Sequence, residues 1–596
     1  MTETLPQERI ELRLALVCYG GVSLAVYMHG VTKELHKLVQ ASSEFDLVGD
    51  PSDARNPFPD TDSQSAYFEA LRELASGGRR LSVSIDVIAG TSAGGINGVV
   101  LGKVLALKGE QEGLRDLWIE EGDLRKLLRS PPIGGVRTRA VLAAVRLLRS
   151  GLFGTGEDEA ASPLKGELMS KLLLHAIKDI DETSEAGTTL LPPGGTLDLY
   201  VTLTDLHGFE VLVPTGAGGA SQRDRQHAQV LRFTAAAGDP AGFGKDATPD
   251  LAFAARATSS FPGAFAPVNA ASFAQECGVP RFEDTLKDRF VFRYEEQSAK
   301  PENQWFVDGG VLDNAPFDLV IAAVSRKRAE TQVVRRIIYI EPDPGRPLVP
   351  PVPDGGPPPA PPSWLSGVSQ AVLGVKGSHS VLRDLMALRD LNTRIAEVGA
   401  ITRSQMDAVQ GLMDELVPEI ADDGTRWVMK DLKQVQDLSD KVHTKARKLL
   451  GAGFSTYCRL KTEAAARRLA DEISVHFVYP PDSSRTSFIR AAIGEWARGR
   501  EEWADPDPTR LMELLRPADV PYRERRLQFL LAGVNALYAD VGAAPDAPLR
   551  QDLDALKTRA WDLLEGLRRT PGDVVGRVPK DAFAFLSTDE LDVNLL

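Results

Sequence analysis

The residues best suited to chemistry are a serine at position 92 and an aspartate at position 308. Ser92 is the centre of Gly90-Thr91-Ser92-Ala93-Gly94, where small residues flank the hydroxyl. A serine in so sharp a turn, between a strand and a helix, is exposed for attack on an acyl carbon. Asp308 opens the turn Asp308-Gly309-Gly310; an acid there either takes part in catalysis or ties the turn through its side chain. We predict that Ser92 is a nucleophile and Asp308 its acidic partner.

The flanking residues predict the elements that position both side chains. Residues 83–89 form an apolar run typical of a strand, and residues 95–101 are compatible with a helix. The N-terminus of that helix would place free N–H groups and positive dipole beside a developing negative charge. Residues 304–307 predict a short buried strand ending at Asp308. Chemistry in open α/β sheets gathers at the ends of parallel strands.

A third segment near the N-terminus has a similar layout. Residues 12–18 predict a strand, Tyr19-Gly20-Gly21-Val22-Ser23 a glycine turn, and residues 24–31 the start of a helix. Backbone N–H groups in such a turn can bind an oxyanion. The alternatives are a phosphate-binding loop or a plain tight turn, although neither the dinucleotide spacing nor the P-loop pattern is present.

In this order, the three segments resemble the patatin-like phospholipase family, and most closely its longer bacterial members. Residues 199–208 resemble the family's mid-domain strand, and residues 257–265 its Ala-Ser-x-x-x-Pro helix end. The resemblance covers residues 10–345. It implies a three-layer α/β/α sandwich with a mostly parallel sheet.

The resemblance also implies roles for individual residues. It implies a catalytic dyad of Ser92 and Asp308, with no histidine between them. The implied oxyanion hole is the backbone of Gly20, Gly21 and Val22, and the implied turn supports are Gly90, Gly94, Gly309 and Gly310. The first turn departs from the family pattern, because Tyr19 replaces its first glycine, Ser23 its basic residue and Leu24 its last glycine.

A Ser-His-Asp triad is the competing arrangement. His379, His443 and His476 follow Ser92 in the order that α/β-hydrolases use, but only His476 lies in a weakly strand-like run. His29 and His207 lie near the motif segments. In the dyad, burial alone would neutralise Asp308, so we expect nearby donors, the Gly309 and Gly310 amides, to keep it charged.

Composition excludes several classes of protein. Of the 596 residues, 43% are hydrophobic and 26% are charged, which is ordinary for a globular protein. A net charge of −14 argues against nucleic acid as a partner. The three cysteines suit a reducing compartment, and no metal-binding motif is present, so we expect no metal and no cofactor. Without a bilayer-length apolar run or a secretory signal, the expected location is cytoplasmic.

Residues 124–153 are rich in arginine and leucine and contain no Asp or Glu. They predict either a peripheral membrane contact or an ordinary solvated basic face. The expected domains are an α/β hydrolase domain at 1–345, a Pro/Gly-rich linker at 346–363 and a mainly α-helical domain at 364–596. Loops are predicted at 50–64 and 214–225. The oligomeric state stays open.

The predicted activity is hydrolysis of fatty-acyl esters of phospholipids or lysophospholipids. Two alternatives remain. The same dyad could act on non-membrane acyl esters or as an acyltransferase, or the chain could be a non-catalytic interaction protein on the same fold.

Overall fold

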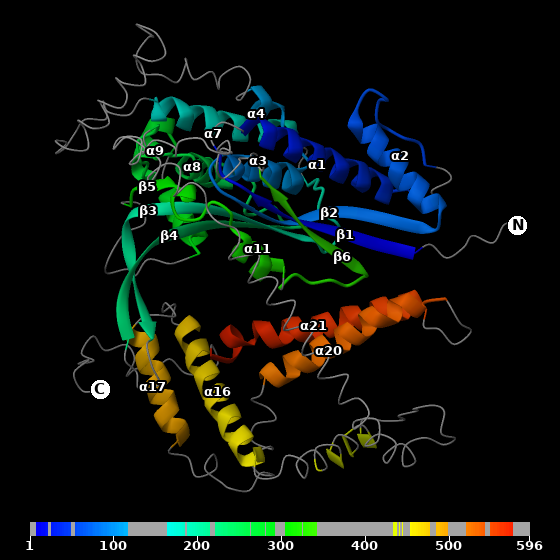
Figure 1. The fold of residues 1–596 in the computed structure, drawn as a ribbon, viewed down its shortest axis with the longest axis vertical. Helices are drawn as coiled ribbons and strands as arrows, with labels where there is room; N and C mark the ends of the chain where they lie inside the picture. The colour runs from blue at the N-terminus through cyan, green and yellow to red at the C-terminus, as the bar shows by residue number, and fades with distance from the viewer. Residues whose placement is uncertain are drawn as a thin grey trace, which may run out of the picture. The chain divides into compact units, whose positions relative to one another are not determined.

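The computed structural model is shown in Figure 1. Apart from a few isolated positions, it describes residues 8–21, 25–48, 54–116, 164–184, 187–214, 221–262, 264–279, 282–291, 304–324, 326–341, 453–476, 484–498, 520–542 and 549–575. Val22, the basic segment 124–153 and the predicted linker 346–363 lie outside the described residues.

The chain divides into two compact units that alternate along the sequence. The first comprises residues 1–211, 224–381 and 537–558, and the second residues 212–223, 382–536 and 559–596. The domain boundary expected between residues 345 and 364 stays a prediction.

A mostly parallel sheet forms the centre of the first unit. Its main order is β4-β3-β2-β1-β6, and β5 pairs with β3 off this path. Strand β1 is parallel to β2 and β6, β2 is parallel to β3, and β5 is antiparallel to β3. The strands are β1 (Glu8–Cys18), β2 (Arg79–Gly90), β3 (Thr196–Pro214), β4 (Ser221–Ala236), β5 (Phe306–Asp308) and β6 (Val333–Ile340).

Helices cover both faces of this sheet. Successive side chains of a strand point to opposite faces, so a strand with consecutive apolar residues contributes to a core on each face. In β1, Leu14, Leu16 and Cys18 belong to one buried core, and Ala15 and Val17 to another. The first core lies under α1 (Ala25–Asp46), α2 (Ser63–Ser76), α3 (Ala93–Leu107), α7 (Gly166–Thr183), α8 (Thr248–Thr258) and α9 (Ala270–Cys277). The second lies under α11 (Phe317–Val324), on the opposite face in Figure 1. The predicted α/β/α sandwich is confirmed.

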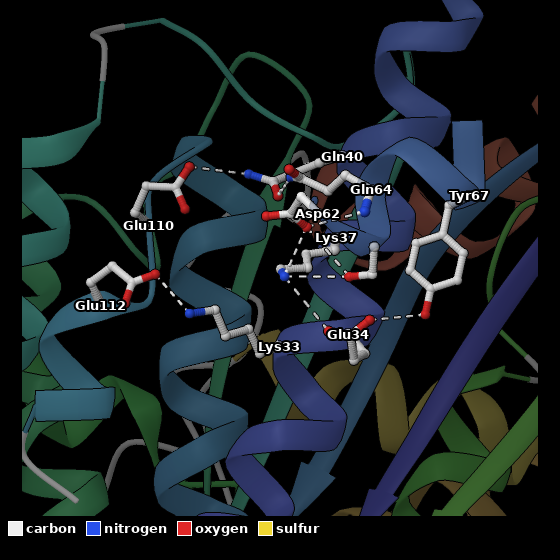
Figure 2. Close-up of polar contacts among 10 residues, drawn as sticks. Lys33, Glu34, Lys37, Gln40, Asp62, Gln64, Tyr67, Glu110 and Glu112 are labelled. Carbon is white, nitrogen blue, oxygen red and sulfur yellow. Dashed lines mark hydrogen bonds and ion pairs between the residues drawn. The ribbon is translucent and has the colours of Figure 1, made fainter. Parts of the chain in front are cut away.

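Polar contacts tie α1 to its neighbours (Figure 2). Lys37 of α1 pairs with Asp62, the N-cap residue of α2, at 2.9 Å. Lys33 pairs at 2.7 Å with Glu112, the first residue of the short helix α4 (Glu112–Asp116).

Strand β4 is the main element that the sequence did not predict. The loop expected at 214–225 covers the end of β3 and the first residues of β4. In the second half of β4, Val230, Leu231 and Phe233 are buried. The first half is polar and charged, so no continuous apolar run marks it as a strand.

The remaining long elements confirm the prediction of a helical C-terminal region. They are α16 (Gly453–His476), α17 (Ser484–Arg498), α20 (Val520–Leu537) and α21 (Arg550–Val575). Ala470 and Ile473 of α16 pack with Ile489 of α17. Leu531 of α20 packs with Ala560 and Leu564 of α21. The weak strand pattern before His476 is wrong, because these residues continue α16.

Candidate active site

Ser92 lies in a strained turn between β2 and α3. Its φ of 53° and ψ of −126° are rare for a residue with a side chain. The turn packs closely against the end of β1, because a Cβ on Gly94 would overlap the carbonyl oxygen of Cys18. A Cβ on Gly90 would lie 2.5 Å from the carbonyl oxygen of Gly94. Larger residues at these positions would therefore open the turn.

The end of α8 supports the serine from the other side. The Ser92 amide donates a hydrogen bond to Thr258 Oγ1 at 2.8 Å, and the Thr258 side chain is fully buried. Thr258 also packs so closely on α3 that a Cβ on Gly95 would lie 2.7 Å from its methyl group. The backbone of the turn is thus fixed by a residue far away in sequence.

Asp308 is the last residue of β5, and its side chain is almost completely buried. Its amide donates to the Ser260 carbonyl at 3.1 Å, and its carbonyl accepts from the Thr204 hydroxyl at 3.0 Å. One carboxylate oxygen, Oδ1, accepts from the Gly310 amide at 2.8 Å. β5 is antiparallel to β3, so Asp308 lies at the end of an antiparallel strand, and not of a parallel one as expected from the sequence.

The electrostatics of Asp308 are dominated by burial, which raises its pKa to about 7. The Ser92 hydroxyl and the Gly310 amide act in the opposite direction, and both lower this pKa. Oδ2 has no hydrogen bond of regular geometry within the described residues. The carboxylate therefore has one oxygen held by the turn and one left for a proton, and both protonation states are populated near neutral pH.

The first glycine turn lies against the nucleophile. A Cβ on Gly20 would be 3.1 Å from Ser92 Cβ, and it would overlap the side-chain oxygen of Asn314. The Gly20 amide donates to the Asn314 carbonyl at 3.3 Å. Of the three residues of the expected oxyanion hole, Gly20 thus has its amide engaged, and Val22 lies outside the described residues.

Asp313 and Asn314, which follow the acid turn (Asp308-Gly309-Gly310), connect all three segments, and no sequence pattern predicted a role for them. Asn314 donates through Nδ2 to the Gly20 carbonyl at 3.3 Å. The Asp313 carbonyl accepts from the hydroxyls of Thr91 at 3.1 Å and Thr202 at 3.4 Å. Both residues are visible beside the Asp-Gly-Gly motif, but their contacts are to residues distant in sequence, which no local pattern reveals.

The histidines near the motifs do not contact Asp308 in the described part of the chain. His29 is buried in α1, and burial lowers its pKa to about 4. His207 is exposed, and its amide donates to Asp205 Oδ1 at 2.9 Å. His379 and His443 lie outside the described residues, and His476 is the last residue of α16. No group of metal-ligating side chains occurs among the described residues.

Comparison with known families agrees with this geometry. Residues 64–321 match the family model of the patatin-like phospholipases. This part of the chain is a patatin-like phospholipase domain. The matched range contains both Ser92 and Asp308 and begins after the first glycine turn. A lipid acyl hydrolase is the general activity that this family supports.

One protein similar to this chain is an uncharacterised membrane protein of Mycobacterium tuberculosis. The two are 30% identical over 417 residues, which make up 66% of this chain and 34% of the relative. The chain therefore spans about a third of that protein's length. No solved structure matches the chain. Among the described residues, no helix combines the length and apolar character that a membrane crossing needs.

Proposed function

We propose that this patatin-like domain is a serine acyl-ester hydrolase that cleaves fatty-acyl esters of phospholipids or lysophospholipids with a Ser92–Asp308 dyad. The observation that carries the proposal is the convergence of the two residues. Ser92 projects from a strained turn at a helix N-terminus, and its hydroxyl lowers the pKa of the buried Asp308 carboxyl. The lipid substrate is supported by the family match over residues 64–321.

In the proposed reaction, Ser92 Oγ attacks the ester carbonyl carbon, and its proton passes to Asp308 Oδ2. The negative charge that forms on the carbonyl oxygen is stabilised by backbone amides of the first turn and by the N-terminus of α3. The Gly20 amide already donates to Asn314, so Gly21 and Val22 are the donors proposed from this turn. The intermediate collapses, and the alcohol leaves with the proton from Asp308.

The acyl group is then bound to Ser92. Water attacks the acyl carbon, Asp308 accepts a proton from that water, and the fatty acid leaves as the proton returns to Ser92 Oγ. The same carboxylate acts as base and acid in each half-reaction, so its pKa of about 7 suits both roles near neutral pH. A peripheral membrane contact through residues 124–153 is part of the proposal.

The test compares Ser92→Ala and Asp308→Asn with two exposed matched controls, Ser76→Ala and Asp60→Asn. The assays are hydrolysis of p-nitrophenyl butyrate and release of fatty acid from phosphatidylcholine vesicles, with the products identified by mass spectrometry. We expect each dyad variant to lose about a thousandfold or more in kcat and each control to keep full activity.

Three results would contradict the proposal. Wild-type protein inactive on every ester would favour a non-catalytic role. Hydrolysis of p-nitrophenyl butyrate without release of fatty acid from vesicles would favour a non-membrane acyl substrate. Loss of activity on changing His379, His443 or His476, with Asp308→Asn still active, would establish a triad.

A further inference from the structure

Arg256 of α8 is a buried charge that the proposed reaction does not use. Its side chain is only 2% exposed, and burial lowers its pKa to about 10, so the guanidinium is still charged near neutral pH. Within the described residues it forms no ion pair. The carboxylate that acts on it from a distance, Glu276, accepts from the Ser170 hydroxyl at 2.6 Å. A buried charge without a paired carboxylate is costly in free energy, so its contacts should indicate what it is kept for.

The guanidinium ties together two oxygen atoms of the chain after α8. Nη1 donates to the Ser260 hydroxyl at 2.5 Å, and Nη2 donates to the Ala266 carbonyl at 3.3 Å. The charge also lies over the Phe265 ring, with Cζ 5.2 Å from the ring centroid. Helix α7 packs against the same group, because a Cβ on Gly166 would lie 2.6 Å from Nη2. The planar group is therefore held in one place.

Both tied segments bond to β5, the three-residue strand that ends at Asp308. The Ser260 carbonyl accepts from the Asp308 amide at 3.1 Å. Val268, two residues after Ala266, exchanges two backbone hydrogen bonds with Phe306, at 2.8 and 3.0 Å. Helix α8 itself packs against β5 (Figure 1). One side chain thus joins two separate anchors of the strand that carries the acid.

The same end of α8 also supports the nucleophile. Thr258, two residues after Arg256, accepts from the Ser92 amide at 2.8 Å. The bond to the serine turn and the bond to the acid strand therefore come from residues only two positions apart, Thr258 and Ser260. A shift of this helix end relative to β5 would change the distance between the serine hydroxyl and the Asp308 carboxyl.

We infer that Arg256 is a positioning residue, which fixes the acid strand against the serine turn by tying Ser260 to Ala266. The inference rests on the proposed function, and adds to it a residue that acts through the backbone of the acid. A guanidinium can donate to both oxygen atoms because its N–H groups form a rigid planar fork, whereas a lysine ammonium is a compact charge on a flexible stem. Positive charge alone should therefore not be enough.

Two neighbouring serines provide a matched test. The hydroxyls of Ser259 and Ser260 each donate to the Arg256 carbonyl at 3.0 Å, and both side chains are buried. Of the two, Ser260 is the one that accepts from the guanidinium. Ser260→Ala removes this acceptor, and Ser259→Ala is the control that removes a hydroxyl-to-carbonyl bond alone. Arg256→Lys keeps the charge without the fork.

The measurements are kcat, KM and the pH profile of kcat/KM for p-nitrophenyl butyrate, with urea denaturation to show that each variant is folded. We expect kcat to fall about tenfold in Ser260→Ala and about a hundredfold in Arg256→Lys, at nearly constant KM, because the dyad is misaligned. Ser259→Ala should keep the wild-type values.

The apparent pKa of the profile separates positioning from a loss of packing. Burial, the Ser92 hydroxyl and the Gly310 amide act on the Asp308 pKa, and none of them is a charged group. The Ser92 hydroxyl lowers this pKa, so a carboxyl that moves away from it should titrate at higher pH. We expect this rise in Ser260→Ala and Arg256→Lys, whereas a loss of packing alone would lower stability without it.

A Ser260→Ala protein with wild-type kcat and apparent pKa, whose hydrolysis still depends on Ser92, would overturn the inference and leave the proposed function intact. Equal losses in Ser259→Ala and Ser260→Ala would also overturn it, because the helix end and not the guanidinium would be responsible. A rise in KM at constant kcat would assign Arg256 to substrate binding instead. If Arg256→Lys does not fold, the two serine variants decide. Absence of hydrolysis by wild-type protein would refute the proposed function itself, and this role with it.

Discussion

The two halves of the candidate dyad are held in different ways. The serine turn depends on glycines of its own motif, because Gly90 and Gly94 allow close backbone contacts that a side chain would block, and the distant Thr258 holds the Ser92 amide. Asp308 takes its place from distant residues: its amide bonds to Ser260 and its carbonyl to Thr204. The turn that carries the nucleophile is therefore recognisable from its own residues, although distant residues also hold it, whereas the position of the base depends on tertiary contacts alone.

This difference predicts how each half fails. A change in the serine turn should act on the backbone and on folding. A change around Asp308 should act on the alignment and charge of one carboxylate. Four measurements can test the comparison.

The largest effect is expected for Gly94→Ala. The added methyl group would overlap the Cys18 carbonyl oxygen, and the backbone of β1 cannot move aside cheaply. We expect the free energy of unfolding to fall by about 3 kcal/mol or more, measured by urea denaturation. Gly533→Ala, at an open helical site, should instead raise it by up to about 1 kcal/mol. Wild-type stability in Gly94→Ala would mean that the serine turn is not close-packed.

The next effect is that of pH on the base. Asp308 must be ionised to accept the Ser92 proton, and burial raises its pKa to about 7. The kcat/KM for p-nitrophenyl butyrate should therefore rise as pH increases through 7, and at pH 5 it should be about a hundredfold below its plateau. A profile that reaches its plateau by pH 5 would show that Asp308 is not the base or that water reaches it freely.

A smaller effect is expected for Asn314→Ala, which removes the bond from Nδ2 to the Gly20 carbonyl. We expect kcat to fall about tenfold through misalignment of the first turn and the acid turn, with little change in KM or in the apparent pKa. The exposed Asn535→Ala serves as control. A rise in KM at constant kcat would assign Asn314 to substrate binding instead.

The smallest expected effect is the gain in stability when the backbone strain at Ser92 is relieved. Glycine adopts a positive φ without penalty, so Ser92→Gly should raise the free energy of unfolding by about 1 kcal/mol while abolishing catalysis. Ser76→Gly, at the end of α2, should lower stability slightly because it loosens a helix. A Ser92→Gly protein less stable than wild type would show that the serine side chain contributes more than its backbone costs.

The sequence predicted the parts of this site that depend on residue type and spacing. The strand, serine and helix around position 92 lie as expected, and Asp308 ends a short strand. Of the two alternatives for Asp308, the turn contact is observed, because Oδ1 accepts from the Gly310 amide. The catalytic role stays a proposal. Thr258 and Ser260 lay inside a segment noted for its family resemblance, yet only the packed structure shows that they hold the serine and the acid.

What could not be predicted depends on burial and on long-range pairing. The expectation that two glycine amides would keep Asp308 charged omitted the extent of its burial, which leaves the pKa raised although Gly310 donates. The antiparallel direction of β5 could not be predicted either, because the sequence of a three-residue strand does not indicate which strand it pairs with. The edge strand β4 was missed for a related reason, because its polar half lacks the apolar alternation that marks a strand.

One strand, β3, sets the spacing between nucleophile and base. Val201 of β3 is paired with Gly90 at the end of the serine's strand, and Leu203, two residues later, is paired with Asp308. Val201 and Leu203, the two residues of β3 that make these pairs, are therefore about 7 Å apart along the strand. Inserting one residue after Val201 would shift the acid by one pairing position and turn Thr204 away from it. Insertions should thus be tolerated at the far end of β3 but not between these two pairs.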